Sequence, residues 1–239
     1  MQYLDLTLST PEENLACDEA LLDLCEAGGA KELLRFWEPR RHFVVLGYSR
    51  RLAADVRVAQ CQRLQIPIMR RVSGGGTVLQ GPGCLNVSLI VDLQTRGPCR
   101  SARGTNAWIL ARNQAALTPI LSQTITVQGS SDLALGTRKF SGNAQRRRQR
   151  FALFHGTFLL RLNLKLMEEI LPIPESQPAY RAYRTHEAFL ANLHVEPQRI
   201  KDALRAAWGA ITPLRQPPLE RIRSLVATRY ATDAWNLKF

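Results

Sequence analysis

The sequence predicts an α+β fold, in which a mixed β-sheet has helices packed against one side. Strand-like and helix-like segments follow one another in mixed order, without the regular alternation that is typical of a parallel α/β sheet. With 239 residues the chain is long enough for one sizeable core, and it shows no repeat, low-complexity tract or long linker. We therefore expect a single domain over residues 1–239.

The first predicted element is a helix that begins after Thr10. Thr10 can cap the helix, Pro11 suits the first helical position, and Glu13 completes a capping box. Gly28 and Gly29 then end the helix, because glycine is the usual residue just past a helix C-terminus.

Alternating strands and a helix are predicted next. Residues 32–37 (ELLRFW) and 42–49 (HFVVLGYS) are predicted strands on either side of a turn at Pro39. Residues 53–65 are predicted to form one helix that leads into a strand over residues 66–72.

The remaining elements continue the mixed order, beginning with a strand whose alternation suits a sheet buried on one face. They are strand 84–93, helix 103–121, strands 124–129, 132–145 and 151–164 with a polar turn around 145–150, and helices 197–209 and 218–231.

The net charge favours anionic partners. The chain has 32 Lys and Arg residues against 20 Asp and Glu residues, a formal charge of +12. Nucleic acid, a phosphorylated ligand or an acidic protein would each suit this excess, and charge alone does not choose among them.

The N-terminus and the cysteines favour a cytoplasmic protein. The first twenty residues lack a basic start followed by an apolar run, and no apolar run approaches the roughly 20 residues of a membrane span. The cysteines are odd in number and form no CxxC pair, so free thiols are expected. They are Cys17, Cys25, Cys61, Cys84 and Cys99.

The three glycines at residues 74–76 form the first candidate binding motif. Successive glycines expose backbone amides that a phosphate or carboxylate can approach, although a tight turn between strands would use the same residues. The pattern is neither a P-loop nor a dinucleotide fingerprint. Because side chains alternate along a strand, one of Arg70 and Arg71 should face the ligand together with Ser73, and the other should point away.

Lys139 and His155 are further candidates. Lys139 precedes a stretch of small residues that would let a ligand approach, but a lone lysine on a strand is usually a solvated charge. His155 lies between apolar runs, where a histidine is more often part of the core than a ligand-binding residue. Neither residue decides the function by itself.

Three stretches in order carry a family resemblance: RRVSGGGTVLQGPGCLNVS at residues 70–88, DLALGTRKFSGNAQ at 132–145 and HGTFLL at 155–160. Together they resemble the lipoate-protein ligase branch of the biotin/lipoate protein ligase (cofactor transferase) family. The resemblance runs from the first helix to TRYATDAWN at residues 228–236. It implies a catalytic domain with a large mixed β-sheet, a small sheet and flanking helices.

The resemblance also implies a reaction. In these ligases lipoate, or octanoate, reacts with ATP to give an acyl-adenylate such as lipoyl-AMP, and the acyl group then passes to a lysine of a lipoyl carrier domain. A carboxylate that attacks the α-phosphate brings negative charges together, so fixed cations and Mg²⁺ suit the site. The implied partner is an acidic lipoyl carrier domain of the 2-oxoacid dehydrogenase E2 type or the glycine cleavage H protein type.

By motif position, Lys139 would be the catalytic residue, in contact with the acyl carbonyl and the α-phosphate. Arg71 would bind phosphate or carboxylate oxygens, and Asp132 would help to hold Mg²⁺. Gly74, Gly75 and Gly76 would make room for the acyl-adenylate. The other implied substrate-binding residues are Trp37, Ser73, Val78, Asn86, Gly142, Ala144, His155 and Gly156.

The sequence departs from the family pattern at several positions. Gln80 stands where many ligases have a histidine, Ser131 replaces the asparagine of an NDL motif, and Cys84 replaces the asparagine of a GN motif. Only four residues follow Trp235, so we expect no accessory domain after the catalytic one. In some relatives a separate subunit supplies that role.

An ATP-independent octanoyl or lipoyl transferase on the same scaffold is the nearest alternative. Such transferases carry the acyl group on a cysteine thiolate shortly before the lysine motif, and the segment TVQGSSDLALGTRK has no cysteine. Cys84 could serve instead, although a small buried hydrophobe is the more common role for such a residue.

A basic nucleic-acid-binding module is an alternative from another class, with the arginines of QRRRQR as its phosphate contacts. The chain shows no known reader motif and no series of stacking aromatics, so nucleic acid is the less favoured partner. We expect Arg146, Arg147, Arg148 and Arg150 instead to lie at the rim of the site and to steer an acidic carrier. A family member without activity is also compatible with the sequence, whereas a biotin ligase would carry GRGRxxR in place of RRVSGGG.

Overall fold

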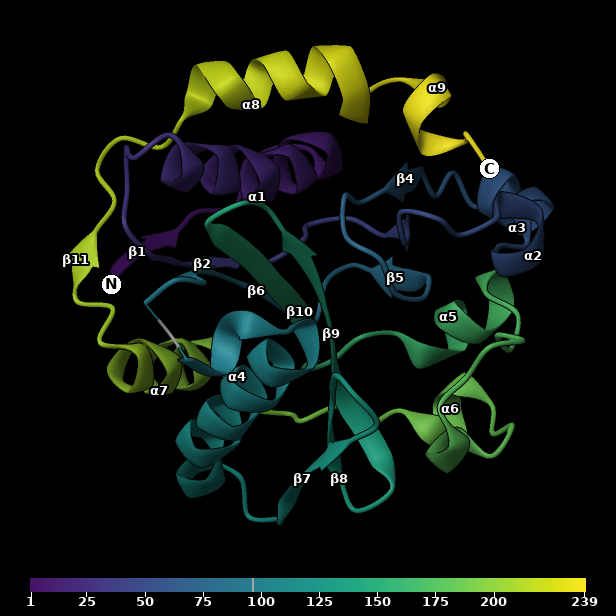
Figure 1. Ribbon diagram of the computed structural model, residues 1–239. Helices are drawn as coiled ribbons and strands as arrows, with labels where there is room; N and C mark the ends of the chain where they lie inside the picture. The colour runs from purple at the N-terminus through teal and green to yellow at the C-terminus, as the bar shows by residue number, and fades with distance from the viewer. Residues whose placement is uncertain (96) are drawn as a thin grey trace.

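The structure, a computed structural model, describes residues 1–95 and 97–239 and contains two β-sheets (Figure 1). The large sheet has the strand order β11-β1-β2-β6-β10-β9-β8-β7, and the small sheet has the order β4-β3-β5. The strands of the large sheet are β1 (Gln2–Asp5), β2 (Leu33–Trp37), β6 (Cys84–Asp92), β7 (Ile125–Gln128), β8 (Asp132–Leu135), β9 (Arg138–Arg147), β10 (Phe151–Leu159) and β11 (Thr212–Pro213). Those of the small sheet are β3 (Phe43–Leu46), β4 (Ile68–Arg70) and β5 (Val78–Gln80).

Strand directions make the large sheet mixed. β1 runs parallel to β2 and β11, whereas the other neighbouring strands pair antiparallel. In the small sheet, β3 is parallel to β4 and antiparallel to β5. These sheets confirm the predicted α+β fold with one large mixed sheet and one small sheet.

The rest of the secondary structure is helical. Among the described residues, no helix is both long and apolar enough to cross a membrane. The α-helices are α1 (Pro11–Glu26), α2 (Leu52–Asp55), α3 (Val58–Arg63), α4 (Ala102–Leu117), α5 (Leu164–Ile170), α6 (His186–Phe189), α7 (Pro197–Trp208), α8 (Leu219–Leu225) and α9 (Asp233–Asn236). Short 3₁₀ helices span Gly97–Arg100, Thr118–Ile120 and Ala179–Arg181, and a π-helix spans Val226–Tyr230.

The helices cover both faces of the large sheet, with α1 and α8 on one face and α4 and α7 on the other (Figure 1). Neighbouring residues of β2 show this, since Leu33 packs in the core with α1 and Leu34 packs in the core with α4 and α7. The expectation of helices on one side was wrong. Its cause is β6, whose residues are all buried, so that both faces of the sheet need a cover.

Helix α1 begins as its sequence predicts. The Thr10 hydroxyl accepts a hydrogen bond from the Glu13 backbone N at 3.2 Å, and the Glu13 carboxylate accepts one from the Thr10 backbone N at 3.0 Å. Pro11 occupies the first turn, and Gly28 follows the helix with φ of +79°. This reciprocal cap fixes where α1 starts and hence which of its side chains face the sheet.

The segment 53–65 forms two short helices instead of the predicted single one. Val56 separates α2 from α3 with an extended backbone, at φ of −137° and ψ of 134°. The next residue, Arg57, donates its backbone N–H to the carbonyl oxygen of Ile170 at 2.9 Å. Arg57 thus bonds to a distant segment instead of continuing a helix. Local sequence patterns cannot predict such a long-range hydrogen bond.

The segment 132–145 was predicted as one strand and is a hairpin. β8 ends at Leu135, which pairs with Arg138 at the start of β9. Gly136 and Thr137 form the turn between them, and Gly136 has φ of +56°, which glycine adopts readily. The turn brings Asp132 and Lys139 onto adjacent strands, close enough to interact.

Candidate active site

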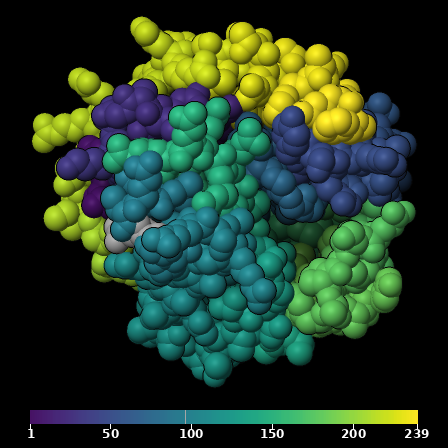
Figure 2. Space-filling view, viewed as in Figure 1, coloured from purple at the N-terminus to yellow at the C-terminus, as the bar shows by residue number. Residues whose placement is uncertain are grey.

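A cavity of about 560 Å³ lies between the large sheet, the small sheet and the segment that carries α5 and α6. Figure 2 shows it as a hollow where the blue small-sheet region and the green α5–α6 region meet the rest of the molecule. Its volume lies within the range of small-molecule sites, roughly 300–1,000 Å³. Acidic and basic side chains in its walls are Asp18, Arg50, Asp55, Arg71, Asp132, Lys139, His155, Arg181 and His186.

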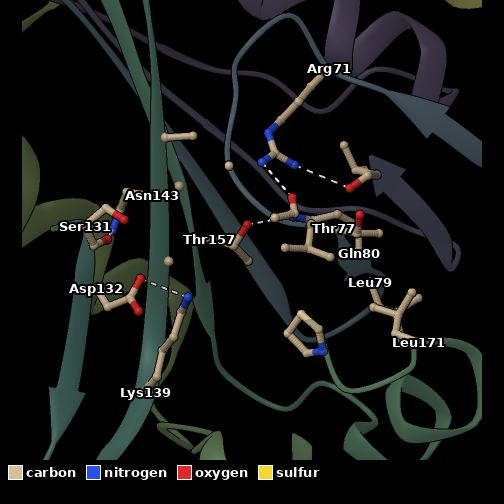
Figure 3. A pocket seen from close by; sticks show the side chains of 18 of the residues that line it. Arg71, Thr77, Leu79, Gln80, Ser131, Asp132, Lys139, Asn143, Thr157 and Leu171 are labelled. Atoms are coloured by element: carbon tan, nitrogen blue, oxygen red, sulfur yellow. Dashed lines mark hydrogen bonds and ion pairs between the residues drawn. The ribbon is translucent and has the colours of Figure 1, made fainter. Parts of the chain in front are cut away.

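Lys139 extends from β9 into this cavity (Figure 3). Its Nζ lies 2.8 Å from Oδ1 of Asp132, and Oδ2 of Asp132 accepts a hydrogen bond from the Tyr180 hydroxyl at 2.7 Å. Burial first, and then the charge of Asp132, raise the pKa of Tyr180, so this hydroxyl remains a donor. Gly142 leaves the space that the lysine needs, because a Cβ there would lie 2.6 Å from Nζ.

Arg71 lies on the opposite wall of the cavity from Lys139 (Figure 3). Its Nε donates to Ser73 Oγ at 3.0 Å, and Nη2 donates to the carbonyl oxygens of Gly74 and Gly76 at 2.6 and 2.8 Å. Among the described residues it has no carboxylate partner, and burial lowers its pKa to about 10. Arg71 is therefore a buried cation whose hydrogen bonds are satisfied but whose charge is not, and an anionic ligand would balance it.

The glycine turn is shaped around this arginine. Gly75 has φ of +90°, and a Cβ there would lie 2.9 Å from Nη2 of Arg71. Gly74 and Gly76 have open space where a Cβ would stand, and Gly75 and Gly76 line the cavity. The bare backbone thus lets Arg71 reach the turn and lets a ligand reach the backbone.

Arg70 points away from the cavity, as strand alternation predicts. Its side chain donates to the carbonyl oxygens of Gly47, Tyr48 and Arg50 at 2.9, 3.1 and 2.7 Å. Two further acceptors, the carbonyl oxygens of Trp235 and Asn236, come from the C-terminal segment. Arg70 therefore ties the C-terminus to the small sheet, while Arg71 serves the site.

His155 connects the glycine motif to α1. Its Nε2 lies 2.6 Å from Ser73 Oγ, and its Nδ1 lies 3.0 Å from Oδ2 of Asp18. Because Arg71 already donates to Ser73 Oγ, the Ser73 hydroxyl can donate to Nε2, which then leaves the ring proton on Nδ1 for Asp18. A continuous chain of hydrogen bonds thus runs from Asp18 through His155 and Ser73 to Arg71.

Asp18 is held by a buried ion pair. Arg35 on β2 approaches it to 2.5 Å, with side chains of both residues at most 4% exposed. Burial alone would raise the pKa of Asp18, but the charge of Arg35 and the hydrogen bonds from His155 and Ser88 outweigh it and lower the pKa. The carboxylate therefore stays ionised and anchors one end of the series of hydrogen bonds that leads through His155 and Ser73 to Arg71.

Gln80, which stands where many of the ligases that the sequence resembles have a histidine, belongs to a polar cluster in the cavity. Its amide N donates to the Thr157 hydroxyl at 2.6 Å, and its amide oxygen accepts from the Asn86 side chain at 2.9 Å. The Thr157 hydroxyl donates in turn to Asn86 Oδ1 at 2.6 Å. The substitution is thus accommodated by a closed set of hydrogen bonds.

The structure brings the predicted site residues together. All of them line the cavity except Ser73, which is enclosed behind it, and Gly74. Sequence patterns missed the segment 171–190 and the pair Asp18 and Arg35. For Asp18 and Arg35 the available signal was a charged residue within an otherwise largely apolar stretch.

Metal binding by protein groups alone does not fit this site. Among residues 1–95 and 97–239, no group of three or more His, Cys, Asp or Glu residues could hold a metal ion. Asp132 has both carboxylate oxygens bonded, to Lys139 and Tyr180. A single carboxylate can still hold Mg²⁺ when substrate phosphates supply the other ligands, and Asp132 fits that limited role.

No cysteine is among the described residues that line the cavity. All five cysteines are buried, and none of them forms a disulfide bond within the described residues. Cys84 is fully enclosed, and burial raises the pKa of its thiol to about 12.

The arginine-rich hairpin end contacts neighbouring parts of the protein. β9 continues through Arg147, which donates to the Cys99 carbonyl, Arg148 pairs with Asp23 at 3.1 Å, and Arg150 pairs with Asp92 at 2.8 Å. None of the four arginines lines the cavity. The side chains of Arg147, Arg148 and Arg150 bond to other parts of the protein, so the expected rim position stays a prediction without a supporting contact.

The chain is similar to known proteins along most of its length. The family model described as the lipoyl protein ligase A/B catalytic domain matches residues 10–205. Octanoyltransferase LipM of Brevibacillus brevis is 23% identical over 273 residues, which cover 99% of this chain and 98% of that protein.

Two solved structures show the same fold. One is a bi-partite lipoate protein ligase from Thermoplasma acidophilum, described together with its E2 lipoyl domain, at 22% identity and a TM-score of 0.79 over 99% of this chain and 96% of that one. The other is a lipoate-protein ligase A bound with ATP, at 22% identity and a TM-score of 0.76 over 99% of both chains.

Proposed function

Because the chain belongs to the family of lipoyl protein ligase A/B catalytic domains, an enzyme family, we propose that it is a lipoate-protein ligase. It would adenylate lipoate or octanoate with ATP and transfer the acyl group to a lysine of a lipoyl carrier domain. The observation that carries this proposal is the cavity wall, where Lys139 faces the buried and unbalanced charge of Arg71 and where the described lining residues include no thiol.

Fixed cations suit the adenylation step. One carboxylate oxygen of the acid attacks the α-phosphorus of ATP, and the bond to the oxygen that bridges the β-phosphate breaks. Lys139 would leave Asp132 and contact the acyl carbonyl and the α-phosphate, where negative charge concentrates. Arg71 is already held in place by Ser73 and the turn carbonyls, so its positive charge is available without rearrangement.

Asp132 would hold Mg²⁺ together with the phosphates, and the ion would offset part of their charge. Among the described residues, the Asp132 carboxylate bonds to Lys139 and to Tyr180. Because Lys139 is expected to turn to the ligand, one carboxylate oxygen would become available to Mg²⁺.

The proposed partners follow from the transfer step. The acceptor is a lysine amine on an acidic lipoyl domain, of the 2-oxoacid dehydrogenase E2 type or the glycine cleavage H protein type. The Thermoplasma structure, which has the same fold, is described as bi-partite and with an E2 lipoyl domain. We propose that a separate accessory subunit also assists this chain.

A second candidate is an ATP-independent octanoyltransferase, favoured by the similarity to LipM along almost the whole chain. Such an enzyme needs a reactive thiolate, whereas Cys84 is buried with a raised pKa. The cavity therefore favours the ligase.

Replacing Cys84 by alanine is expected to leave acyl transfer to the carrier within about twofold of the unaltered rate. The reason is that the thiol packs in the apolar core beside the cavity and does not line it. Mass spectrometry of the native protein after incubation with an octanoyl-carrier donor should show no added acyl group. A stoichiometric thioester on Cys84, together with an inactive variant, would instead establish the transferase.

The proposed function is tested by mixing the protein with lipoate, or octanoate, and a purified lipoyl domain, with and without Mg-ATP. The carrier should gain the acyl mass only when ATP is present, and pyrophosphate should be released. Acylation from an octanoyl-carrier donor without ATP would reject the ligase in favour of the second candidate.

A further inference from the structure

Arg181 is a second buried cation in the wall of the cavity. It is 5% exposed, and within the described chain only its Nε has a hydrogen-bond acceptor, the carbonyl oxygen of Arg184 at 3.1 Å. Its Nη2 is buried and has no hydrogen-bond partner among residues 1–95 and 97–239. A buried charged donor without an acceptor is costly, so its presence beside a cavity indicates a partner that enters from the cavity.

The charge of Arg181 is also left without an ion pair. Among the described residues no carboxylate lies within ion-pair distance of it, and the one that acts on it, Glu168, accepts a hydrogen bond from the His186 backbone N at 2.7 Å. Burial lowers the pKa of Arg181, and the attraction of Glu168 only partly offsets this. The missing partner is therefore an anion.

Two other arginines with an unpartnered nitrogen differ from Arg181 in position. Arg35 forms its buried ion pair with Asp18, and Arg70 donates to five carbonyl oxygens. Neither lines the cavity. Arg181 alone among the three can be completed by a ligand.

The position of Arg181 relates it to Lys139. Its neighbour Tyr180 donates to Asp132, which pairs with Lys139, and the backbone N of Ala191 donates to the carbonyl oxygen of Lys139 at 2.9 Å. Arg181 therefore belongs to the segment that packs against the lysine strand, at the end of the cavity where the α-phosphate is proposed to lie.

We propose that Arg181 binds the β- and γ-phosphates of the nucleotide and then the pyrophosphate that leaves, an inference that rests on the proposed ligase function. When the carboxylate oxygen bonds to the α-phosphorus, the electron pair of the broken P–O bond departs with the pyrophosphate. A guanidinium fork matches phosphate oxygens and stabilises this added charge. An ATP-independent transferase has no leaving group that requires such a site.

The test uses Arg181→Met, because methionine keeps an apolar stem over Phe189, whose ring lies 4.9 Å from the guanidinium carbon, and removes the charge. Binding of inorganic pyrophosphate, measured by calorimetry, is expected to weaken by about 10- to 100-fold, the size typical of a lost hydrogen bond to a charged group. Adenylation of lipoate should slow by a similar factor. Transfer from pre-formed lipoyl-AMP to the carrier should not change, since that step involves no pyrophosphate.

Two further variants control the experiment. Arg181→Lys should give an intermediate loss, because an ammonium keeps the charge without the fork, and it carries the test if Arg181→Met does not fold. Arg199→Met removes an exposed arginine on α7 and should change nothing. Unchanged pyrophosphate binding in Arg181→Met, or equal losses in adenylation and in transfer from lipoyl-AMP, would overturn the inference. If the unaltered protein forms no lipoyl-AMP, the ligase proposal fails, and pyrophosphate binding still decides the role of Arg181.

Discussion

Replacing Lys139 by alanine is expected to slow acyl transfer to the carrier by more than about 100-fold, equivalent to roughly 3 kcal/mol of lost transition-state stabilisation. The side chain of Lys139 is 25% accessible, and among the described residues its ion-pair partner is Asp132. Its ammonium can therefore follow negative charge from the attacking carboxylate to the acyl-adenylate. Both half-reactions should be measured, as pyrophosphate release and as transfer from pre-formed lipoyl-AMP.

Lys31→Ala is the matched control, since this exposed lysine does not line the cavity and its loss should leave both rates unchanged. Lys139→Arg keeps the charge but enlarges the head group. The lysine tip lies so close to Gly142 that a Cβ there would be 2.6 Å from Nζ, which leaves little room for a guanidinium, so partial activity is expected. Near-normal transfer by Lys139→Ala, with the protein folded as judged by its thermal unfolding, would show that Lys139 is a structural partner of Asp132 and no catalytic residue.

Local sequence signals predicted those parts of the fold that depend on neighbouring residues. The cap of α1 needs only Thr10, Pro11 and Glu13, and the structure has it. Long-range packing is different, because the break at Val56 depends on a hydrogen bond between Arg57 and Ile170. The covering of both sheet faces likewise depends on helices that arrive from distant parts of the chain.

The candidate site divides in the same way. The glycine turn, Arg71 and Lys139 carry a family resemblance in three short motifs, and the structure gathers them in one cavity. Asp18 and Arg181 lie in stretches without a motif, and their importance arises from burial and from partners far away in the chain. Spacing along the sequence contains no information on such contacts.

Replacing Asp18 by alanine is expected to lower the free energy of unfolding by about 3–5 kcal/mol, the cost of breaking a buried ion pair from one side. The variant leaves Arg35, which is fully buried, without its counter-ion, and frees His155 from the bond that orients its ring. Chemical denaturation at pH 7 measures the loss. Asp202→Ala removes an exposed aspartate on α7 and should stay within roughly 0.5 kcal/mol of the unaltered protein.

The pH dependence separates the charge of Asp18 from its packing. Its pKa is lowered in the folded protein, so the stability it contributes is fully present above its unfolded pKa of about 4 and is lost as the pH falls through the folded value. Asp18→Asn keeps the size of the side chain and removes this titration. The difference in stability between the unaltered protein and Asp18→Asn should therefore be constant between about pH 5 and 7 and should shrink below about pH 4. A difference that persists undiminished into acid would mean that Asp18 stabilises the protein through hydrogen bonds that do not depend on its charge.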